Sequence, residues 1–222
     1  LYGDRPTATH LGLGMQRYAN GGNTIRWIDA LVAVSGNIGI PGGGANFGNL
    51  QVSECFDKAT LMLPERKRAS RTWTMMKQAE EILQANDPPV GMVIVTCGNP
   101  LAQVPNTNLV KKAFASVETV VVFEQFMTDT AAAADYVLPV AASFEEEDVY
   151  CASMYHAYLN YGPKLIDPPG EAKPDLWIWT ELAKRLGFED EFAYTREQFL
   201  AMALRPLERY GITLERLKAE HR

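Results

Sequence analysis

The chain has 222 residues, of which 47% are hydrophobic and 22% charged, so it can bury a core as one large domain or two small ones. Its formal net charge is -6. Because nucleic acid and anionic membranes bind clustered Lys and Arg, we expect neither as a partner. No apolar run approaches the ~20 residues that span a bilayer, so we expect a soluble chain without direct membrane contact.

Cysteine and histidine usage predicts no metal site within the chain. The cysteines are widely spaced and include no C-x-x-C pair, so we expect them to bind neither zinc nor an iron–sulfur cluster and to form no disulfide framework. A reducing compartment fits this cysteine content best. The histidines have no second ligand at coordinating spacing. These residues are Cys55, Cys97, Cys151, His10, His156 and His221.

The first segment predicts one helix between two glycine-rich loops. Apolar residues recur at helical spacing over 25–34, with Asn23 and Thr24 as caps and Gly36 as the stop. The following stretch, 50–72, has the composition of a surface excursion, and its short basic run 66–68 carries no assigned function.

From Trp73 onward the chain alternates between helical and apolar stretches. A helix from about 72 ends at Asn86-Asp87-Pro88-Pro89, because the prolines cannot continue it. The next predicted elements are a strand over 90–97, a helix over 107–116, a strand over 118–123, a short helix over 128–135 and a strand over 136–142 that Pro139 interrupts. Helices are predicted in the tail at about 174–187, 195–204 and 212–220.

This order predicts an α/β fold with a parallel, Rossmann-like doubly wound sheet flanked by helices. Strands that are apolar over five or six consecutive positions are typical of a parallel sheet covered on both faces. We expect a single α/β unit over 1–222, in which 1–72 holds the glycine-rich loops and first helix, 73–165 the β-α-β core, and 166–222 a helical tail.

Two turns at the carboxyl ends of predicted strands are the candidate binding elements. Gly98 and Asn99 follow the first strand, and Phe123 and Glu124 end the second. Ligands of parallel sheets collect at this edge, where an acidic residue commonly accepts hydrogen bonds from a ribose or a base. The alternative is that the first turn is only turn chemistry and Glu124 a solvated charge. The G-x-G-x-x-G fingerprint of dinucleotide binding is missing.

Taken together, the motifs resemble a known family. The stretches GLGMQ, SGNIGIPGGGANFGN, CGNPL, VVVFEQFMTDTAAAADYVLPVAASFEEED and PPGEAKPDLWIWTELAKRLG occur in the order and spacing of the molybdopterin oxidoreductase family. More narrowly, the chain resembles the middle of the large catalytic subunit of the dimethyl sulfoxide reductase type. The resemblance implies a bis(molybdopterin guanine dinucleotide) cofactor with molybdenum in a full-length parent.

The resemblance implies roles for particular residues. The family's pyranopterin-contacting glutamine falls on Gln16, with Gly12 and Gly14 shaping its loop. The asparagine after the apolar strand falls on Asn99, next to Gly98. The acidic guanosine contact falls on Glu124, with Phe123 beside it, and an aspartate near the start of a later helix falls on Asp175. Capping of that helix is the competing interpretation for Asp175.

Departures from the family pattern limit the prediction. The stretch PGGGANFGNLQ lacks the arginine that often follows the family's glycine-rich loop, and no residue can be assigned as the molybdenum ligand. In relatives that ligand and the cysteines of a [4Fe–4S] cluster lie upstream of the first motif, so a cluster is expected, if at all, in the parent. We expect Cys97 to be a small packed residue and the acidic run 145–148 a solvated face.

Two functions from different classes remain open. The first is a cofactor-binding segment of a molybdenum-dependent oxidoreductase that catalyses oxygen-atom or electron transfer, incomplete as a catalyst on its own. Its partners would be the rest of the parent catalytic subunit and an electron-transfer iron–sulfur subunit. The second is a non-catalytic α/β nucleotide-binding or interaction module. Neither the substrate nor the compartment of the parent, bacterial or archaeal cytoplasm or periplasm, follows from these residues.

Overall fold

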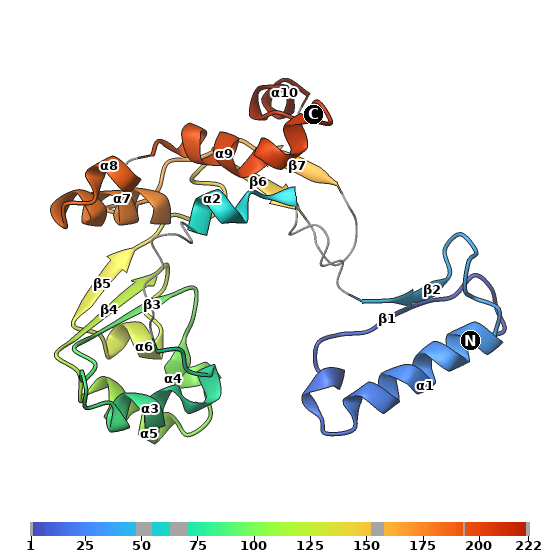
Figure 1. The fold of residues 1–222 in the computed structure, drawn as a ribbon, viewed down its shortest axis with the longest axis horizontal. Helices are drawn as coiled ribbons and strands as arrows, with labels where there is room; N and C mark the ends of the chain where they lie inside the picture. Colours follow the sequence, from blue (N-terminus) through green and yellow to red (C-terminus); the bar gives the residue numbers. More distant parts are fainter. Residues whose placement is uncertain (1, 48–54, 63–70, 152–157, 193, 221–222) are drawn as a thin grey trace. The chain divides into compact units, whose positions relative to one another are not determined.

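The computed structural model describes residues 2–47, 55–62, 71–151, 158–192 and 194–220 (Figure 1). The chain divides into two compact units. Unit 1 comprises 1–56 and 150–160, and unit 2 comprises 57–149 and 161–222. In the described residues no helix is long and apolar enough to cross a membrane.

Unit 1 is built around the helix α1 (Gly21–Val34) and a short parallel strand pair, β1 (Ala8–His10) and β2 (Gly44–Asn46). The helix begins at Gly21, earlier than the predicted Asn23 and Thr24 caps, and Gly36 stops it as predicted, at a φ of 72° that favours glycine.

A fully buried asparagine connects the N-terminal segment of unit 1 to the turn after α1. Asn37 accepts a hydrogen bond from the Thr7 backbone N–H at 2.8 Å and donates to the Tyr2 carbonyl at 3.1 Å and the Ser35 hydroxyl at 2.9 Å. Because its amide oxygen and nitrogen are both paired, its burial leaves neither end of the amide unsatisfied.

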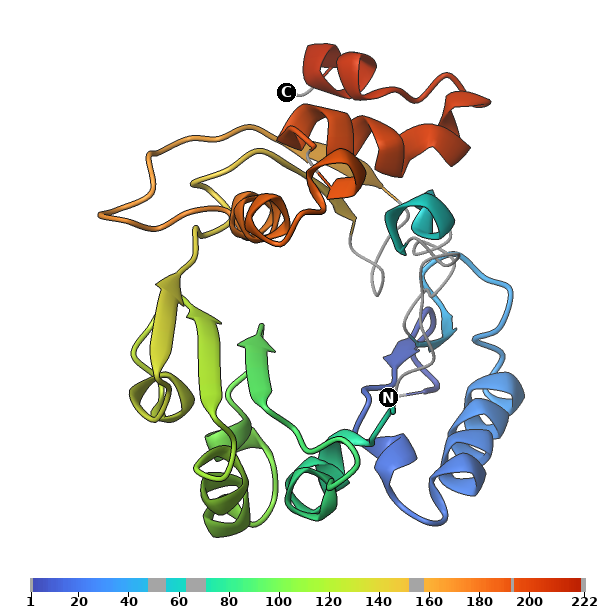
Figure 2. The same cartoon turned by 60° about the vertical axis from the view of Figure 1, so that its left-hand side comes forward.

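Unit 2 contains a three-stranded parallel sheet in the order β3 (Met92–Thr96), β4 (Thr119–Glu124) and β5 (Tyr136–Pro139). Figure 2 shows the three arrowheads at the same end of the sheet. Its helices are η4 (Met75–Lys77), α3 (Gln78–Gln84), α4 (Pro100–Gln103), α5 (Thr107–Phe114) and α6 (Asp129–Ala132). The predicted parallel α/β architecture is confirmed, although the sheets are small and the order of these three strands does not reverse.

The core of unit 2 lies between this sheet and the helices α3, α5 and α6. Val110 and Val122 have no exposed surface, and Phe114 and Val120 are almost as buried. Helix α5 buries its apolar side and exposes its lysines, as the helical spacing of its apolar residues predicts. Burying a side chain of this size stabilises a fold by roughly 1.5–3 kcal/mol, so this cluster holds β3 and β4 in place.

The rest of unit 2 consists of helices and a strand pair, and some residues of that strand pair belong to unit 1. The predicted tail helices are confirmed as α7 (Asp175–Arg185), α9 (Arg196–Glu208) and α10 (Leu214–Glu220). Helix α9 starts with a capping box between Thr195 and Gln198 and continues through Pro206, beyond the predicted end. Short elements that the sequence did not predict are α2 (Lys58–Met62), α8 (Glu189–Phe192), β6 (Asp148–Cys151) and β7 (Leu159–Gly162).

Candidate functional site

The carboxyl ends of the strands in unit 2 form one continuous edge. Thr96 at the end of β3 is paired with Phe123, and Glu124 at the end of β4 is paired with Pro139. Beyond β5, the Lys173 N–H donates to the Pro139 carbonyl at 3.1 Å and the Ala141 N–H donates to the Lys173 carbonyl at 3.0 Å. The segment that enters α7 therefore lies beside β5 like a fourth strand.

Asn99 follows β3 and is held by a buried threonine from the neighbouring loop. The Thr130 hydroxyl, with no exposed surface, donates to Asn99 Oδ1 at 2.6 Å, and the Thr130 N–H donates to the same oxygen at 3.3 Å. The Gln103 Oε1 accepts from the Asn99 N–H at 2.8 Å. Within the described residues no acceptor faces the Asn99 Nδ2 group, which leaves two N–H donors at the edge of the sheet.

Glu124 ends β4 and keeps a partly exposed carboxylate. One carboxylate oxygen, Oε1, accepts from the Gln125 N–H at 2.8 Å, and the Gln125 side chain donates to the Ala141 carbonyl at 3.3 Å. The second oxygen of Glu124 has no hydrogen bond from the described part of the chain, so this carboxylate can accept from a ligand.

Phe123 lies beside Glu124 but faces the interior. Only 2% of its surface is exposed, and its ring packs against Trp179 of α7 with a centroid distance of 5.1 Å. Any contact between Phe123 and a ligand would therefore involve its backbone rather than its ring. The aromatic pair also holds α7 against the sheet.

Asp175 is the first residue of α7, directly after Pro174. Pro174 occupies the N-cap position and gives no side-chain cap hydrogen bond, while the Asp175 carboxylate in the first turn interacts favourably with the helix dipole. Burial raises the pKa of Glu146, and the negative charge of Asp175 adds a smaller contribution in the same direction.

Neighbouring strands lie about 4.8 Å apart, and one strand separates Glu124 from the segment that leads into Asp175. The segment at Lys173 therefore lies roughly 10 Å from β4 across the sheet, and Asp175 follows two residues beyond Lys173. That separation suits two different parts of one nucleotide better than two bonds to one base.

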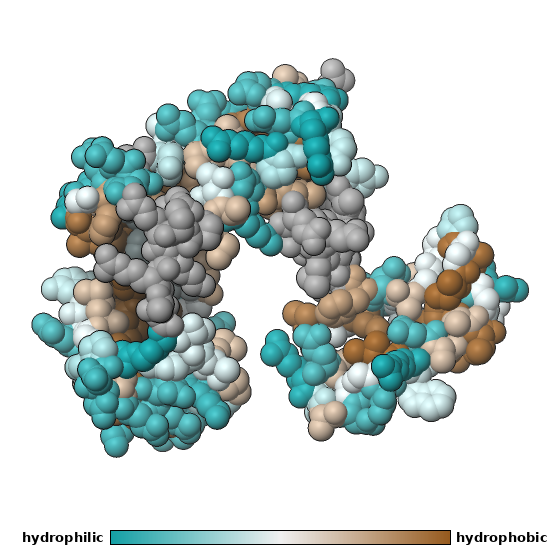
Figure 3. All heavy atoms as spheres, in the orientation of Figure 1, coloured by the Kyte–Doolittle hydropathy of each residue, from teal (hydrophilic) through white to brown (hydrophobic). Residues whose placement is uncertain are grey.

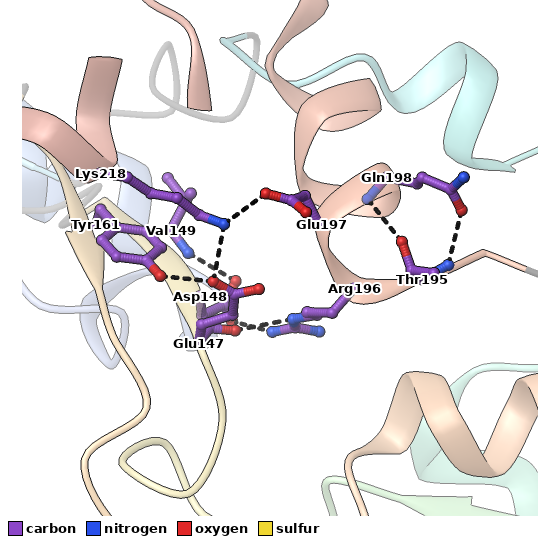
Figure 4. A network of polar contacts seen from close by, with 9 residues as sticks. All are labelled: Glu147, Asp148, Val149, Tyr161, Thr195, Arg196, Glu197, Gln198 and Lys218. Carbon is purple, nitrogen blue, oxygen red and sulfur yellow. Dashed lines mark hydrogen bonds and ion pairs between the residues drawn. The ribbon is translucent and has the colours of Figure 1, made fainter. Parts of the chain in front are cut away.

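The acidic run 145–148 is not the solvated face that its composition predicted. Arg196 at the start of α9 contacts Glu146 at 3.3 Å. It also contacts Asp148 at 2.9 Å, and its Nε donates to the Glu147 carbonyl at 2.9 Å (Figure 4). The prediction was wrong because the partner cation lies about fifty residues away in sequence, where a local pattern gives no sign of it.

The side chain of Glu147 is held by a second group of contacts (Figure 4). It accepts from the Tyr161 hydroxyl and pairs with Lys218 of α10 at 3.2 Å, while Lys218 also pairs with Glu197 at 2.8 Å. Burial would raise the pKa of Glu147, but the hydrogen bonds from Tyr161 and Lys218 outweigh it and hold the pKa below its usual value. Burial raises the pKa of Glu146, against the opposing charge of Arg196.

A cavity of about 750 Å³ lies beside this network and next to Asp175. Its lining includes Glu146, Tyr161, Pro174 and Arg196. Among the described residues no cluster of His, Cys, Asp and Glu could hold a metal ion. The ion pairs of the acidic run with Arg196 and Lys218 connect it to α9 and α10. His156 and His221 lie outside the described residues, as does the basic run 66–68.

Gln16, Gly12 and Gly14 belong to unit 1. Gln16 is exposed, in a short 3-10 helix (η1, Met15–Arg17) whose position depends on Gly21, because a Cβ there would lie 2.2 Å from the Met15 carbonyl oxygen. A Cβ at Gly12 or Gly14 would meet nothing within 4 Å. Packing within the chain therefore gives these two glycines no steric role, whereas close approach of a ligand to the backbone would.

Cys97 differs from its prediction. It is exposed rather than packed, and its backbone has a φ of 53° in the left-handed region. A non-glycine residue rarely adopts this conformation, and the turn places Gly98 and Asn99 directly beyond the strand. The sequence also gave no indication of Thr130 as part of the site, although its place two residues after the α6 cap Thr128 is a weak signal.

Comparison with known proteins gives a consistent result. A family model described as molybdopterin oxidoreductase matches residues 1–185. A probable oxidoreductase, YyaE, of Bacillus subtilis is 62% identical over 98% of this chain and 33% of its own length. A trimethylamine-N-oxide reductase of Haemophilus influenzae is 31% identical over 82% of this chain and 25% of its own length.

A solved structure also matches. Acetylene hydratase from Pelobacter acetylenicus superposes with a TM-score of 0.55 at 27% identity, over 64% of this chain and 19% of that one. The chain spans about a third of the length of the curated relatives it matches.

Proposed function

Because the chain belongs to the molybdopterin oxidoreductase family, we propose that it is the segment of a molybdenum-dependent oxidoreductase that binds a molybdopterin guanine dinucleotide cofactor. The observation that carries the proposal is the edge of the sheet in unit 2, where unpaired donor and acceptor groups from three loops come together. Open α/β sheets bind nucleotides at this edge.

The groups at the edge fit a guanine nucleotide. Guanine presents adjacent N–H donors, and Glu124 keeps a carboxylate oxygen to accept them. Asp175 lies at the start of α7, beyond the segment that pairs with β5, and its place suits the ribose or the far side of the base. The Nδ2 donors of Asn99 fit an acceptor such as a phosphate oxygen.

Gln16 is assigned to the pyranopterin part of the cofactor. It is exposed, it carries both a donor and an acceptor, and the glycines before it leave the backbone open to close approach. The bound cofactor would supply the oxygen-atom or electron transfer, while this chain would bind it, orient it and tune its surroundings. The curated relatives, which are named an oxidoreductase and a reductase, support the oxidoreductase class. The structural neighbour does not, because it is named a hydratase.

The proposed partner of this segment is the rest of a parent catalytic subunit. Unit 1 exposes large apolar side chains, including Trp27 at 73%, Val34 at 83% and Ile38 at 56%. Figure 3 shows hydrophobic surface on this unit. Apolar surface of this extent on a small unit is typical of an interface. We also propose that a [4Fe–4S] cluster and an electron-transfer subunit, where present, belong to the parent and not to this segment.

The test is guanine content in the full-length protein. Glu124→Gln and Asp175→Asn should each weaken cofactor retention by about tenfold or more, because a hydrogen bond to a charged group contributes roughly 1.5–3 kcal/mol. Guanine nucleotide is measured after acid release from the purified protein. The matched control is Glu118→Gln, an exposed carboxylate just before the opposite end of β4, which should keep its guanine. Full guanine content in both site variants would refute this placement of the nucleotide.

A further inference from the structure

The strongest unassigned feature at the edge of the sheet is Thr130. It is fully buried, it is polar, and it belongs to α6 rather than to the loop that contains Asn99. Polar side chains without any exposed surface are costly unless they are hydrogen-bonded, so their bonds are informative. Thr130 forms hydrogen bonds with two positions on the loop after β3, Asn99 and Leu101.

The directions of these bonds are determined by chemistry. The Leu101 N–H can only donate, so the Thr130 hydroxyl oxygen accepts from it, at 3.1 Å. The hydroxyl proton is then available for Asn99 Oδ1 at 2.6 Å, and the Thr130 N–H donates to the same oxygen at 3.3 Å. With two donors facing it, the atom next to Thr130 must be the amide oxygen and not the nitrogen.

We infer that Thr130 is a positioning residue for cofactor binding, which fixes the Asn99 carboxamide with its oxygen inward and its Nδ2 donors toward the ligand edge. Asn99 then acts on the ligand as a donor only, and the group it binds must be an acceptor, such as a phosphate or carbonyl oxygen. The inference rests on the proposed function and deepens it, since it assigns the atom of Asn99 that recognises the cofactor.

The geometry also explains why a threonine is needed. A valine would keep the shape but would leave the Leu101 N–H without its acceptor and Asn99 Oδ1 without its closest donor. The carboxamide could then rotate and present its oxygen to the ligand, where it would repel an acceptor. Serine would keep both hydrogen bonds.

The experiment compares variants of the full-length protein for bound pterin and guanine after gel filtration. Thr130→Val should weaken cofactor retention by about tenfold, the scale of one hydrogen bond, and Thr130→Ser should restore it. The matched control is Thr180→Val. Thr180 is also a buried threonine of unit 2, but its hydroxyl has no hydrogen-bond partner in the described residues, so its loss should leave cofactor content unchanged.

A second variant separates positioning from folding. Asn99→Asp keeps an acceptor for Thr130 but replaces the Nδ2 donors with an anionic oxygen. The melting temperature of the cofactor-free protein should therefore stay close to that of the wild type, while cofactor retention falls by tenfold or more. Thr130→Val combined with Asn99→Ala should lose no more cofactor than Asn99→Ala alone, because Thr130 acts through Asn99.

The outcomes are distinguishable. If the wild type binds cofactor and either Thr130→Val or Asn99→Asp retains it fully, the inference is wrong while the proposed function stands. If Thr130→Val does not fold, Asn99→Asp decides in the same way. A wild-type protein purified from a cofactor-producing host without any pterin or guanine would overturn the proposed function and the inference with it.

Discussion

At the scale of the residue, the structure assigns tasks to individual atoms. Asn99 accepts with its amide oxygen from Thr130 of α6, and in the proposed site its amide nitrogen donates to a ligand. Glu124 divides its carboxylate in the same way, with one oxygen bound to the Gln125 N–H. Phe123 shows the opposite case, because burial against Trp179 removes its ring from any ligand contact.

Gln16→Ala tests the assignment in unit 1. The side chain is exposed on a 3-10 turn, so its loss should change the free energy of unfolding of the cofactor-free protein by no more than about 0.5 kcal/mol, as is typical of surface substitutions. Pterin retention in the full-length protein should fall by roughly three- to tenfold, the worth of one neutral hydrogen bond. Arg17→Gln, the adjacent exposed position, serves as the control. Unchanged pterin content and turnover in Gln16→Ala would show that the glutamine has no part in binding.

At the scale of the element, the acidic run and the helices α9 and α10 form one polar assembly. Arg196 and Lys218 each contact two acidic side chains, and the contacts connect β6 to both helices (Figure 4). Glu146 and Glu147 are adjacent in sequence, yet the protein shifts their pKa values in opposite directions. The difference is environmental. Burial raises the pKa of Glu146 against the charge of Arg196, whereas at Glu147 burial is outweighed by the hydrogen bonds from Tyr161 and Lys218 together with the nearby positive charges.

This opposition predicts opposite pH behaviour for two neighbouring variants. The lowered pKa of Glu147 contributes stability that is fully present above pH 4.5, the ordinary pKa of a glutamate, and that is lost as the pH falls through the folded-state pKa. Glu147→Gln should therefore lower the melting temperature at pH 7, by a few degrees, roughly 2–4 °C for each kcal/mol lost. Its difference from the wild type should shrink below pH 4.5.

The raised pKa of Glu146 predicts the opposite dependence of stability on pH. Its contribution is fully present below 4.5 and is lost as the pH rises through the folded-state pKa, so the ionised carboxylate is a cost at pH 7. Glu146→Gln should not lower the melting temperature at pH 7, because Arg196 keeps Asp148 at 2.9 Å. Thermal melts of both variants from pH 3.5 to 8 on the cofactor-free protein provide the measurement. A parallel pH response of the two variants would contradict the opposite environments.

At the scale of the whole molecule, the proposed cofactor-binding residues are divided between two compact units. Gln16 and its glycines belong to unit 1, whereas Asn99, Glu124 and Asp175 belong to unit 2. The units differ in their cores. Unit 2 buries a continuous apolar cluster around Val110 and Val122, while unit 1 buries little besides Leu11, Val32 and Asn37 among its described residues. The proposed interface with the rest of a parent subunit would complete so small a core.

The last prediction concerns the metal content of residues 1–222 expressed alone. We expect neither molybdenum nor an iron–sulfur cluster at stoichiometric level, because the cysteines are too far apart in sequence for a cluster motif and no metal-binding group occurs among the described residues. Elemental analysis for molybdenum and iron in the purified chain is the measurement, with the full-length protein as the positive control. One molybdenum or four iron atoms per chain would contradict the prediction.

The sequence by itself determined the elements and the edge at which to look for a ligand. The apolar runs before Cys97 and up to Phe123 predicted parallel strands covered on both faces. The parallel pairing of β3 and β4 is confirmed. The predicted burial of β3 on both faces is wrong for the described residues, because Met92 and Ile94 are exposed at 54% and 42%. Helix ends near Gly36 and the tail helices followed from local caps and periodicity. The candidate residues also came from sequence, through motif order, and their roles at the site stay predictions.

Only the tertiary structure decided what each polar side chain is paired with. The acidic run contacts Arg196 and Lys218, and Asn99 contacts Thr130, across 31 to 71 residues of chain. Exposure of Cys97 and burial of the Phe123 ring were decided in the same way. The physical reason is that caps and periodicity act within a few residues, whereas burial and hydrogen-bond partners depend on which distant segments pack together.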